Sequence, residues 1–153
     1  MHDFLTDLSF LSCIIEKINS YELNLCCKLP VHTHMIDLSD VESVRSALAQ
    51  MCRNPAMRVT GRLHDVPNRW EPMTVREPDT QMYFTDDGAW HFIADLLVSG
   101  APAKCIPPSD KFPDFAYYLV EATGGSTPIY MKVALQREVK KVIGLSFHYS
   151  DPR

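Results

Sequence analysis

The chain lacks the sequence features that define several large classes of protein. Its 153 residues contain no apolar run long enough to cross a membrane, so we expect no membrane partner. The sequence starts without the basic region of a secretory signal, and we therefore expect a cytoplasmic location. Neither a glycine-rich phosphate loop nor a G-x-S-x-G motif occurs, so the signatures of two common enzyme classes are missing.

Positive charge is also scarce. Fifteen Lys and Arg stand against 19 Asp and Glu, a net charge of −4, whereas a nucleic-acid-binding domain usually carries a basic face. From Ala103 onward, however, seven Lys and Arg outnumber five Asp and Glu. The C-terminal part is therefore mildly basic, which is compatible with contact to a polyanion and is not evidence of it.

Disulfide and zinc-ligand spacings are absent as well. The five cysteines are odd in number and irregularly spaced, so we expect reduced thiols rather than a disulfide framework. Cys26 and Cys27, with His32 and His34, form the one combination suggestive of zinc, because two histidines at i and i+2 share a strand face. Adjacent cysteines chelate a single tetrahedral ion poorly, and no C-x-x-C pair is present. We predict no metal and no cofactor, with this combination as the alternative.

Hydrophobic periodicity predicts three amphipathic helices. The first covers residues 4–18, the second starts at a capping box formed by Ser39 and Glu42 and ends before Asn54-Pro55, and the third covers residues 85–100. Their buried faces are marked by apolar residues at helical spacing: Leu5, Leu8, Leu11, Ile15 and Ile18; Val41, Val44, Leu48 and Met51; Trp90, Ile93, Leu96 and Leu97. Residues 1–30 belong either to the core or to an N-terminal helical extension or arm.

Between the last two helices we predict one strand and a loop. Residues 57–63 alternate in a way that places Arg58 and Arg62 on an exposed basic face. Residues 64–81, and likewise residues 101–113 after the third helix, are rich in proline and lack a sustained period, so both are predicted loops.

The C-terminal part predicts an antiparallel β-meander with strands at residues 116–123, 129–136 and 142–149. Alternation along the last two strands separates an apolar face from a polar face. A pairing of Gln136 with Val142 sets four further opposite pairs: Tyr130 with His148, Lys132 with Ser146, Met131 with Phe147, and Val133 with Leu145. The whole chain is thus predicted to be a single α+β domain, with two or three helices packed on an antiparallel sheet that ends in a three-stranded meander.

The polar face of the meander gathers Tyr130, Lys132, Ser146 and His148. A metal-independent ribonuclease needs groups that move protons at the 2′-hydroxyl and the leaving 5′-oxygen, and a cation for the phosphate charge. A histidine titrates near neutral pH, so His148 fits proton transfer, while Lys132 fits charge stabilisation and Tyr130 fits hydrogen-bond donation. The alternative is that these side chains form the solvated face of an amphipathic sheet.

Further substrate contacts are predicted from Ser146 on the same face, from Arg58 and Arg62, and from His91 on the third helix, which could approach the polar face. Each has a plain structural alternative. The two arginines would otherwise form a solvated face, and the histidine would be a boundary residue with a local hydrogen bond.

The segment IYMKV at residues 129–133, a charged turn, and VIGLSFH at residues 142–148 resemble the C-terminal hairpin of MqsR-type toxins. That family, like the related RelE-type toxins, ends with a pattern close to apolar-Tyr-apolar-Lys, a turn, an apolar run, Ser-Phe and a polar residue. The resemblance implies a small α+β ribonuclease that cleaves mRNA and is inhibited by a cognate antitoxin, with Tyr130, Lys132 and His148 in its site. It covers the last quarter of the chain, and the family's Phe-Tyr-Lys-Ser segment has no counterpart here.

We therefore predict a toxin-like, metal-independent endoribonuclease with RNA as its substrate and an antitoxin as its partner. The alternative is a non-enzymatic interaction module, such as a small regulator or inhibitor that binds a protein through its sheet face or its proline-rich loops. The acidic composition and the incomplete catalytic set favour this alternative.

Overall fold

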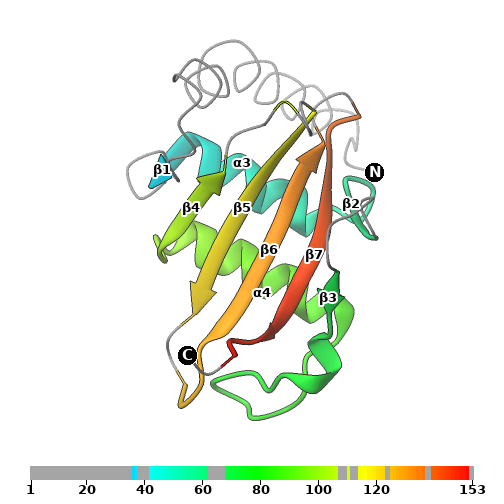
Figure 1. The fold of residues 1–153 in the computed structure, drawn as a ribbon. Coiled ribbons are helices and arrows are strands. Elements are labelled where there is room, and N and C mark those ends of the chain that lie inside the picture. The colour runs from blue at the N-terminus through cyan, green and yellow to red at the C-terminus, as the bar shows by residue number, and fades with distance from the viewer. Residues whose placement is uncertain are drawn as a thin grey trace, which may run out of the picture.

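The computed structural model describes residues 36–37, 42–61, 68–106, 110, 114–122, 125–136 and 139–151 (Figure 1). Within them, two α-helices and a short 3₁₀ helix accompany one sheet, which confirms the predicted α+β class. The helices are α3 (Glu42–Arg53), η2 (Pro72–Thr74) and α4 (Asp86–Val98). The strands are β1 (Ile36–Asp37), β2 (Arg58–Thr60), β3 (Arg69–Trp70), β4 (Ala103–Ile106), β5 (Phe115–Ala122), β6 (Ile129–Gln136) and β7 (Lys141–Tyr149). The predicted helix at residues 4–18 lies outside the described part.

The sheet is mixed rather than purely antiparallel. Its strand order is β1-β4-β5-β6-β7-β2, and β3 also pairs with β7. Neighbours from β1 to β7 run antiparallel, whereas β2 and β3 run parallel to successive parts of β7. Strands β3 and β4 correct the two predicted loops. Both are too short for a period to be visible, and β4 is also framed by prolines at positions 102 and 107.

The two described helices follow their sequence signals. In α3, Val44, Leu48 and Met51 are buried, and the helix ends at Arg53, directly before Asn54-Pro55. The third predicted helix starts at residue 85, and Thr85 is the N-cap of α4, where its hydroxyl accepts a hydrogen bond from the Gly88 amide at 2.9 Å. None of the helices in the described ranges is long and apolar enough to span a bilayer.

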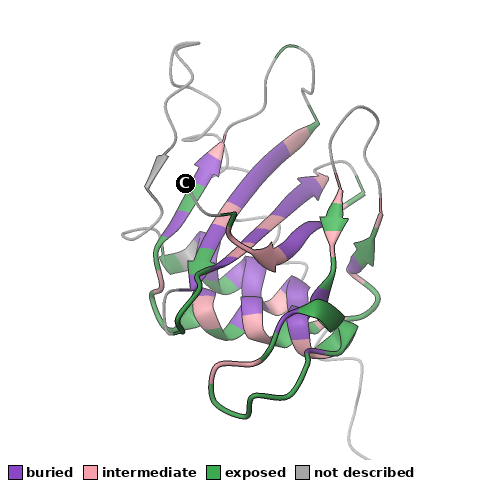
Figure 2. Cartoon of the chain, turned by 60° about the horizontal axis from the view of Figure 1, so that its bottom comes forward, coloured by how far each residue is buried: buried purple, intermediate pink, exposed green. Residues whose placement is uncertain are grey.

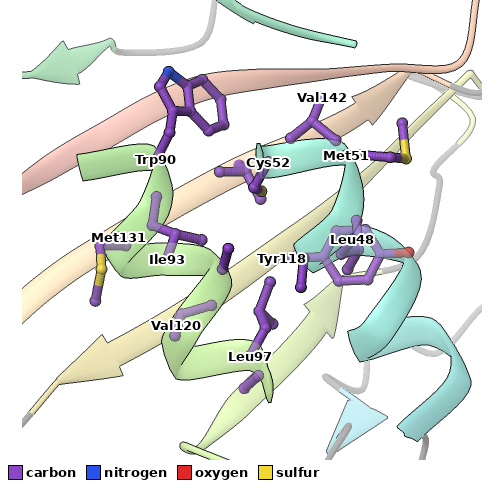
Figure 3. Close-up of a cluster of buried hydrophobic side chains, with 14 of the residues drawn as sticks. Leu48, Met51, Cys52, Trp90, Ile93, Leu97, Tyr118, Val120, Met131 and Val142 are labelled. Atoms are coloured by element: carbon purple, nitrogen blue, oxygen red, sulfur yellow. The ribbon is translucent and has the colours of Figure 1, made fainter. Parts of the chain in front are cut away.

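Both helices cover the same side of the sheet, which we call the helix face. Figure 3 shows Leu48 and Met51 of α3 and Ile93 and Leu97 of α4 pointing toward side chains of the central strands. Figure 2 shows that buried positions occur on both helices and along the central strands. All belong to one buried core cluster. The strand residues of this cluster include Tyr118, Val120, Met131, Val142 and Phe147.

An aromatic group closes the end of the core beside β7. The Trp70 ring lies 4.7 Å from that of Trp90 and 5.7 Å from that of Phe147. Both indoles press against Gly144, since a Cβ built there would come within 2.6 Å of Trp70 and 2.9 Å of Trp90. The absence of a side chain at Gly144 therefore makes room for the tryptophan pair.

Two buried arginines bind the C-terminal carbonyls of the helices. Arg45 of α3 donates to the Leu97 oxygen at 2.8 Å and to the Ala101 oxygen at 2.6 Å, at the end of α4. Arg58 donates to the Cys52 oxygen at 2.7 Å, at the end of α3, and forms an ion pair with Asp87. The last carbonyls of a helix lack partners within it and carry partial negative charge, so a guanidinium satisfies them and opposes the helix dipole.

The position of Arg58 corrects the predicted basic face of residues 57–63. Arg58 is only 9% exposed and lies over the Trp90 ring, whereas Val59 is 42% exposed. The alternation is thus reversed at this point. The reason is tertiary: β2 follows directly from α3, and its first side chain turns back to the free carbonyls of that helix.

The register of β6 and β7 is confirmed in one half and wrong in the other. The predicted pairs Tyr130–His148, Met131–Phe147 and Lys132–Ser146 are observed. Beyond Lys132 a β-bulge shifts the register by one residue, so Val133 pairs with Gly144 instead of Leu145, and Gln136 with Lys141 instead of Val142. The bulge puts Leu145 and Ser146 side by side on the same face of the sheet, which an unbroken alternation would not do.

Candidate functional site

The sheet face opposite the helices, here called the second face, carries the predicted polar cluster. Figure 1 looks onto this face, with the helices behind the sheet. Its side chains fall into cross-strand rows, because paired residues of neighbouring strands share a face. One row runs Leu119, Lys132, Ser146 and Arg69, and the next runs Glu121, Tyr130 and His148. All four predicted meander residues therefore lie in two adjacent rows.

Tyr130 and His148 are in direct ring contact. Their ring centroids are 5.3 Å apart with the planes tilted by 36°, and both side chains are half-buried. Burial raises the pKa of the Tyr130 phenol, and the nearby Glu121 carboxylate raises it further. Tyr130 is therefore a neutral hydrogen-bond donor at physiological pH, not a phenolate.

The backbone selects one tautomer of His148. Its Nδ1 lies 2.7 Å from the Tyr149 carbonyl oxygen. A carbonyl oxygen only accepts hydrogen bonds, so Nδ1 carries the proton and the neutral ring has its lone pair on Nε2. This is the arrangement that a histidine needs to accept a proton at Nε2 and to return it from the same atom.

Lys132 lies in the adjacent row, and its ammonium group is partly buried. Its Nζ is 4.8 Å from the centroid of the Tyr117 ring, a cation–π contact. Partial burial lowers the pKa of the Lys132 ammonium. A partly desolvated ammonium interacts more strongly with an approaching anion than a fully hydrated one does.

Arg69 is the second cation of the site, and it could not be found from the sequence. It lies in β3, inside a predicted loop, and pairs in parallel with Ser146 of β7. Its guanidinium contacts the carboxylates of Asp151 at 3.0 Å and Glu71 at 3.3 Å. The hydrogen bond from Arg69 lowers the pKa of Asp151. Only the parallel pairing of β3 with β7 brings this arginine beside the meander.

The bulge shapes the centre of the site. Because Leu145 and Ser146 occupy neighbouring positions on the second face, the apolar part of that face ends directly beside Lys132 and the polar part begins. Ser146 is 6% exposed and lies between Lys132 and Arg69 in the row. Bulges frequently occur beside active sites, where they redirect a side chain.

The remaining predicted substrate contacts do not join this group. Arg58 is buried on the helix face, as described above. His91 is exposed on α4, and α4 packs on the helix face, so His91 does not approach the polar rows. Arg62 and the alternative metal ligands Cys26, Cys27, His32 and His34 lie outside the described residues.

Neither a group of metal ligands nor a similarity to known proteins identifies a function for the described residues. Among the described residues, no three His, Cys, Asp or Glu side chains are grouped as metal ligands would be. No family model, curated protein or solved structure matches the chain. The arrangement combines the His148 imidazole, the Tyr130 phenol and two cations, Lys132 and Arg69, in two adjacent cross-strand rows. Neighbouring strands in each row are about 5 Å apart. These side chains supply the groups that phosphodiester chemistry requires.

Proposed function

We propose that this protein is a toxin-like, metal-independent endoribonuclease that cleaves single-stranded RNA on the polar half of its second face. The observation that carries the proposal is the grouping of His148, Tyr130 and Lys132 in adjacent rows, joined by Arg69 from a separate strand. The sequence resemblance to MqsR-type and RelE-type toxins points to His148, Tyr130 and Lys132 as well.

In the proposed reaction, Nε2 of His148 takes the proton of the 2′-hydroxyl group. The 2′-oxygen then attacks the adjacent phosphorus, the bond to the 5′-oxygen breaks, and Nε2 of His148 delivers the proton that it took to that leaving oxygen. The products are a 2′,3′-cyclic phosphate and a free 5′-hydroxyl. Lys132 and Arg69 stabilise the negative charge on the phosphate oxygens, and Tyr130 donates a hydrogen bond to them.

Binding of a single strand also has physical support. Tyr130 and His148 offer ring surfaces on which bases can stack, next to the two cations that would contact the backbone. The net charge of the chain is −4, and Arg69 is paired with Asp151 and Glu71, so binding of RNA requires the Arg69 guanidinium to exchange these carboxylates for phosphate oxygens.

The test is cleavage of a labelled single-stranded RNA by the purified full-length protein in the presence of a chelator. We expect cyclic-phosphate products, and no cleavage when the 2′-hydroxyl at the cut site is replaced by hydrogen. His148→Ala and Lys132→Met should each lower the rate by about 100-fold or more. The matched control is His91→Ala, which removes an exposed histidine on the opposite side of the sheet and should leave the rate unchanged.

Two results would reject the ribonuclease. One is RNA left intact by the wild-type protein at high enzyme concentration. The other is equal cleavage by the wild type, His148→Ala and Lys132→Met, which would identify a contaminating nuclease. In cells, the corresponding result would be a harmless wild type that leaves total RNA intact.

A second function, a protein-interaction module, is favoured by the loop at residues 71–84. Three large apolar side chains on it are exposed: Met73 at 76%, Met82 at 70% and Tyr83 at 55%. The loop has defined structure, because the Glu77 amide donates to the Met82 carbonyl at 2.8 Å and Arg76 stacks on Tyr83. Exposed methionines suit adaptable protein contacts. Under this alternative, the double variant Met73→Ser, Met82→Ser abolishes the effect that expression of the wild type has on cells. The His148→Ala variant keeps that effect.

A further inference from the structure

The second face has an apolar half that neither described helix covers. Tyr117, Ala134, Ile143 and Leu145 form a separate cluster, against which Ile106 and Phe115 pack. Ala134 and Leu145 are fully buried and Ile143 is 7% exposed, although α3 and α4 lie on the opposite face. Side chains of a sheet reach such burial beneath a second layer, so this half of the face has a covering element.

We propose that residues 4–18 of the same chain are that element and pack on this cluster through their apolar stripe. The stripe consists of Leu5, Leu8, Leu11, Ile15 and Ile18, and its spacing of three and four is that of one helix face. The helix face of the sheet is already filled, because the core residues of α3 and α4 against it are almost fully buried. The second face is therefore where a third amphipathic helix can bury its stripe.

The topology brings the N-terminal segment to the correct place. Strand β1 lies at the sheet edge beside β4, with Ile36 paired to Cys105 and Asp37 to Lys104. Followed backward along the chain, β1 therefore runs toward the end of β4 that carries Ile106. Ile106 begins the cross-strand row that continues through Tyr117, Ala134 and Ile143.

The length of the predicted helix is compatible with the width of the apolar cluster. A helix over residues 4–18 is about 22 Å long at 1.5 Å per residue. The row from Ile106 to Ile143 crosses three strand spacings, or about 14 Å. Roughly 17 residues separate Ile18 from Ile36, and an extended chain of that length reaches about 55 Å. The segment is long enough to cover the cluster, and its connection does not restrain it.

This inference does not rest on the proposed function, but it limits where a substrate can bind. The covered row adjoins the row of Lys132 and Ser146, separated by the bulge. With residues 4–18 in place, the substrate-binding part of the second face is confined to the two polar rows.

The first test places the photoreactive residue p-benzoylphenylalanine at position 11 of the full-length protein and maps the cross-links by mass spectrometry. We expect cross-links within one chain to the segments that carry Ile106, Phe115 and Ile143. The matched control has the same residue at position 9, off the stripe, and should give at least about five-fold fewer cross-links to these segments. Cross-links from position 11 to α3 or α4 instead would overturn the proposal.

The second test is a double-mutant cycle with Leu11→Ala and Ile143→Ala, followed by urea unfolding. If the two residues touch, the double variant is destabilised less than the single variants predict, by at least about two-fold in the unfolding equilibrium constant. The control cycle pairs Leu11→Ala with Val44→Ala of the helix-face core and should be additive. Additivity in both cycles rejects the proposal.

A second copy of the chain is the competing cover, and both tests detect it. In that case the position-11 cross-links run between chains or are absent from the cluster. The wild type would also sediment as a dimer that dissociates on dilution, and Leu145→Lys would convert it to a monomer. This result overturns the proposal.

Discussion

On β6 and β7, neighbouring residues enter two different environments. Met131 and Phe147 are fully buried beneath the helices, whereas Tyr130 and His148, one position along each strand, are half-buried on the second face. The helix face is continuous, with one core from β4 to β7. The second face is divided at the bulge between an apolar cluster and the polar rows. The same strands therefore supply stability on one side and a positioned group of polar side chains on the other.

The difference shows how a rigid scaffold can hold a site. Phe147 is packed among Trp70, Phe84 and Phe92, and this packing determines where the next residue, His148, can point. Substitutions on the helix face should thus lower stability, and substitutions in the polar rows should lower activity with little effect on stability. Three paired measurements test whether the two faces differ in this way.

The largest effect is expected from Phe147→Ala compared with His148→Ala. Removing the fully buried Phe147 ring should lower the free energy of unfolding by about 3–5 kcal/mol. Removing the half-buried His148 ring should lower it by less than about 1 kcal/mol. Urea unfolding followed by circular dichroism measures both. Similar losses for the two variants would show that the polar row is part of the core.

A loss of stability of intermediate size is expected from Gly144→Ala. The added methyl group meets both indoles, so Trp70 or Trp90 must move, and we expect a loss of about 1–3 kcal/mol. These are the two tryptophans of the chain, so their fluorescence spectrum should shift as well. The matched control is Gly125→Ala, whose Cβ would have its nearest neighbour at 3.9 Å. An unchanged spectrum in Gly144→Ala would contradict the close packing of the indoles.

The smallest effect concerns pH and the buried thiol of Cys52. Burial raises its pKa from 9.0 to about 12, while in the unfolded chain the thiol ionises near the lower value. The neutral thiol thus favours the folded state below pH 9, and this contribution is lost as the pH rises toward 12. Between pH 9 and 10 the loss from this group is about 1 kcal/mol.

The measurement is urea unfolding at pH 7, 9 and 10 for the wild type and Cys52→Ala. The variant loses some packing at every pH, but its stability should fall less steeply above pH 9. Parallel curves for the two proteins would show that Cys52 ionises equally in both states.

Prediction from sequence succeeded where the signal is local and long. The bounds of β6 match the predicted strand, and α3 ends before Asn54-Pro55 as predicted. Half of the register followed from alternation alone, so Tyr130, Lys132, Ser146 and His148 were placed together correctly. The bulge has no signal in the sequence, because Leu145 is apolar and its hydrophobicity is compatible with either register.

Prediction failed where a residue's role depends on a distant partner. A charged residue such as Arg58 is expected to be exposed in a half-buried strand. Arg58 is nevertheless buried, because it donates to the Cys52 carbonyl at the end of the preceding helix and lies over the Trp90 ring. Arg69 lies in a proline-rich stretch without a period, and its two-residue strand exists only through pairing with β7. His91 follows the helix period, but the period does not state which side of a sheet the helix will cover.

The amino-acid sequence alone was sufficient to predict the class of the fold, the end of α3, the approximate extent of α4 and the alternation of the meander, because periodicity, caps and turns act within a few residues. The predicted capping box of Ser39 and Glu42 includes a position outside the described residues. The tertiary structure decided the rest of the candidate site. It added Arg69, removed Arg58 and His91, and divided the second face at a bulge. These outcomes depend on contacts between residues far apart in the chain. Such contacts form only when the helices and strands pack together.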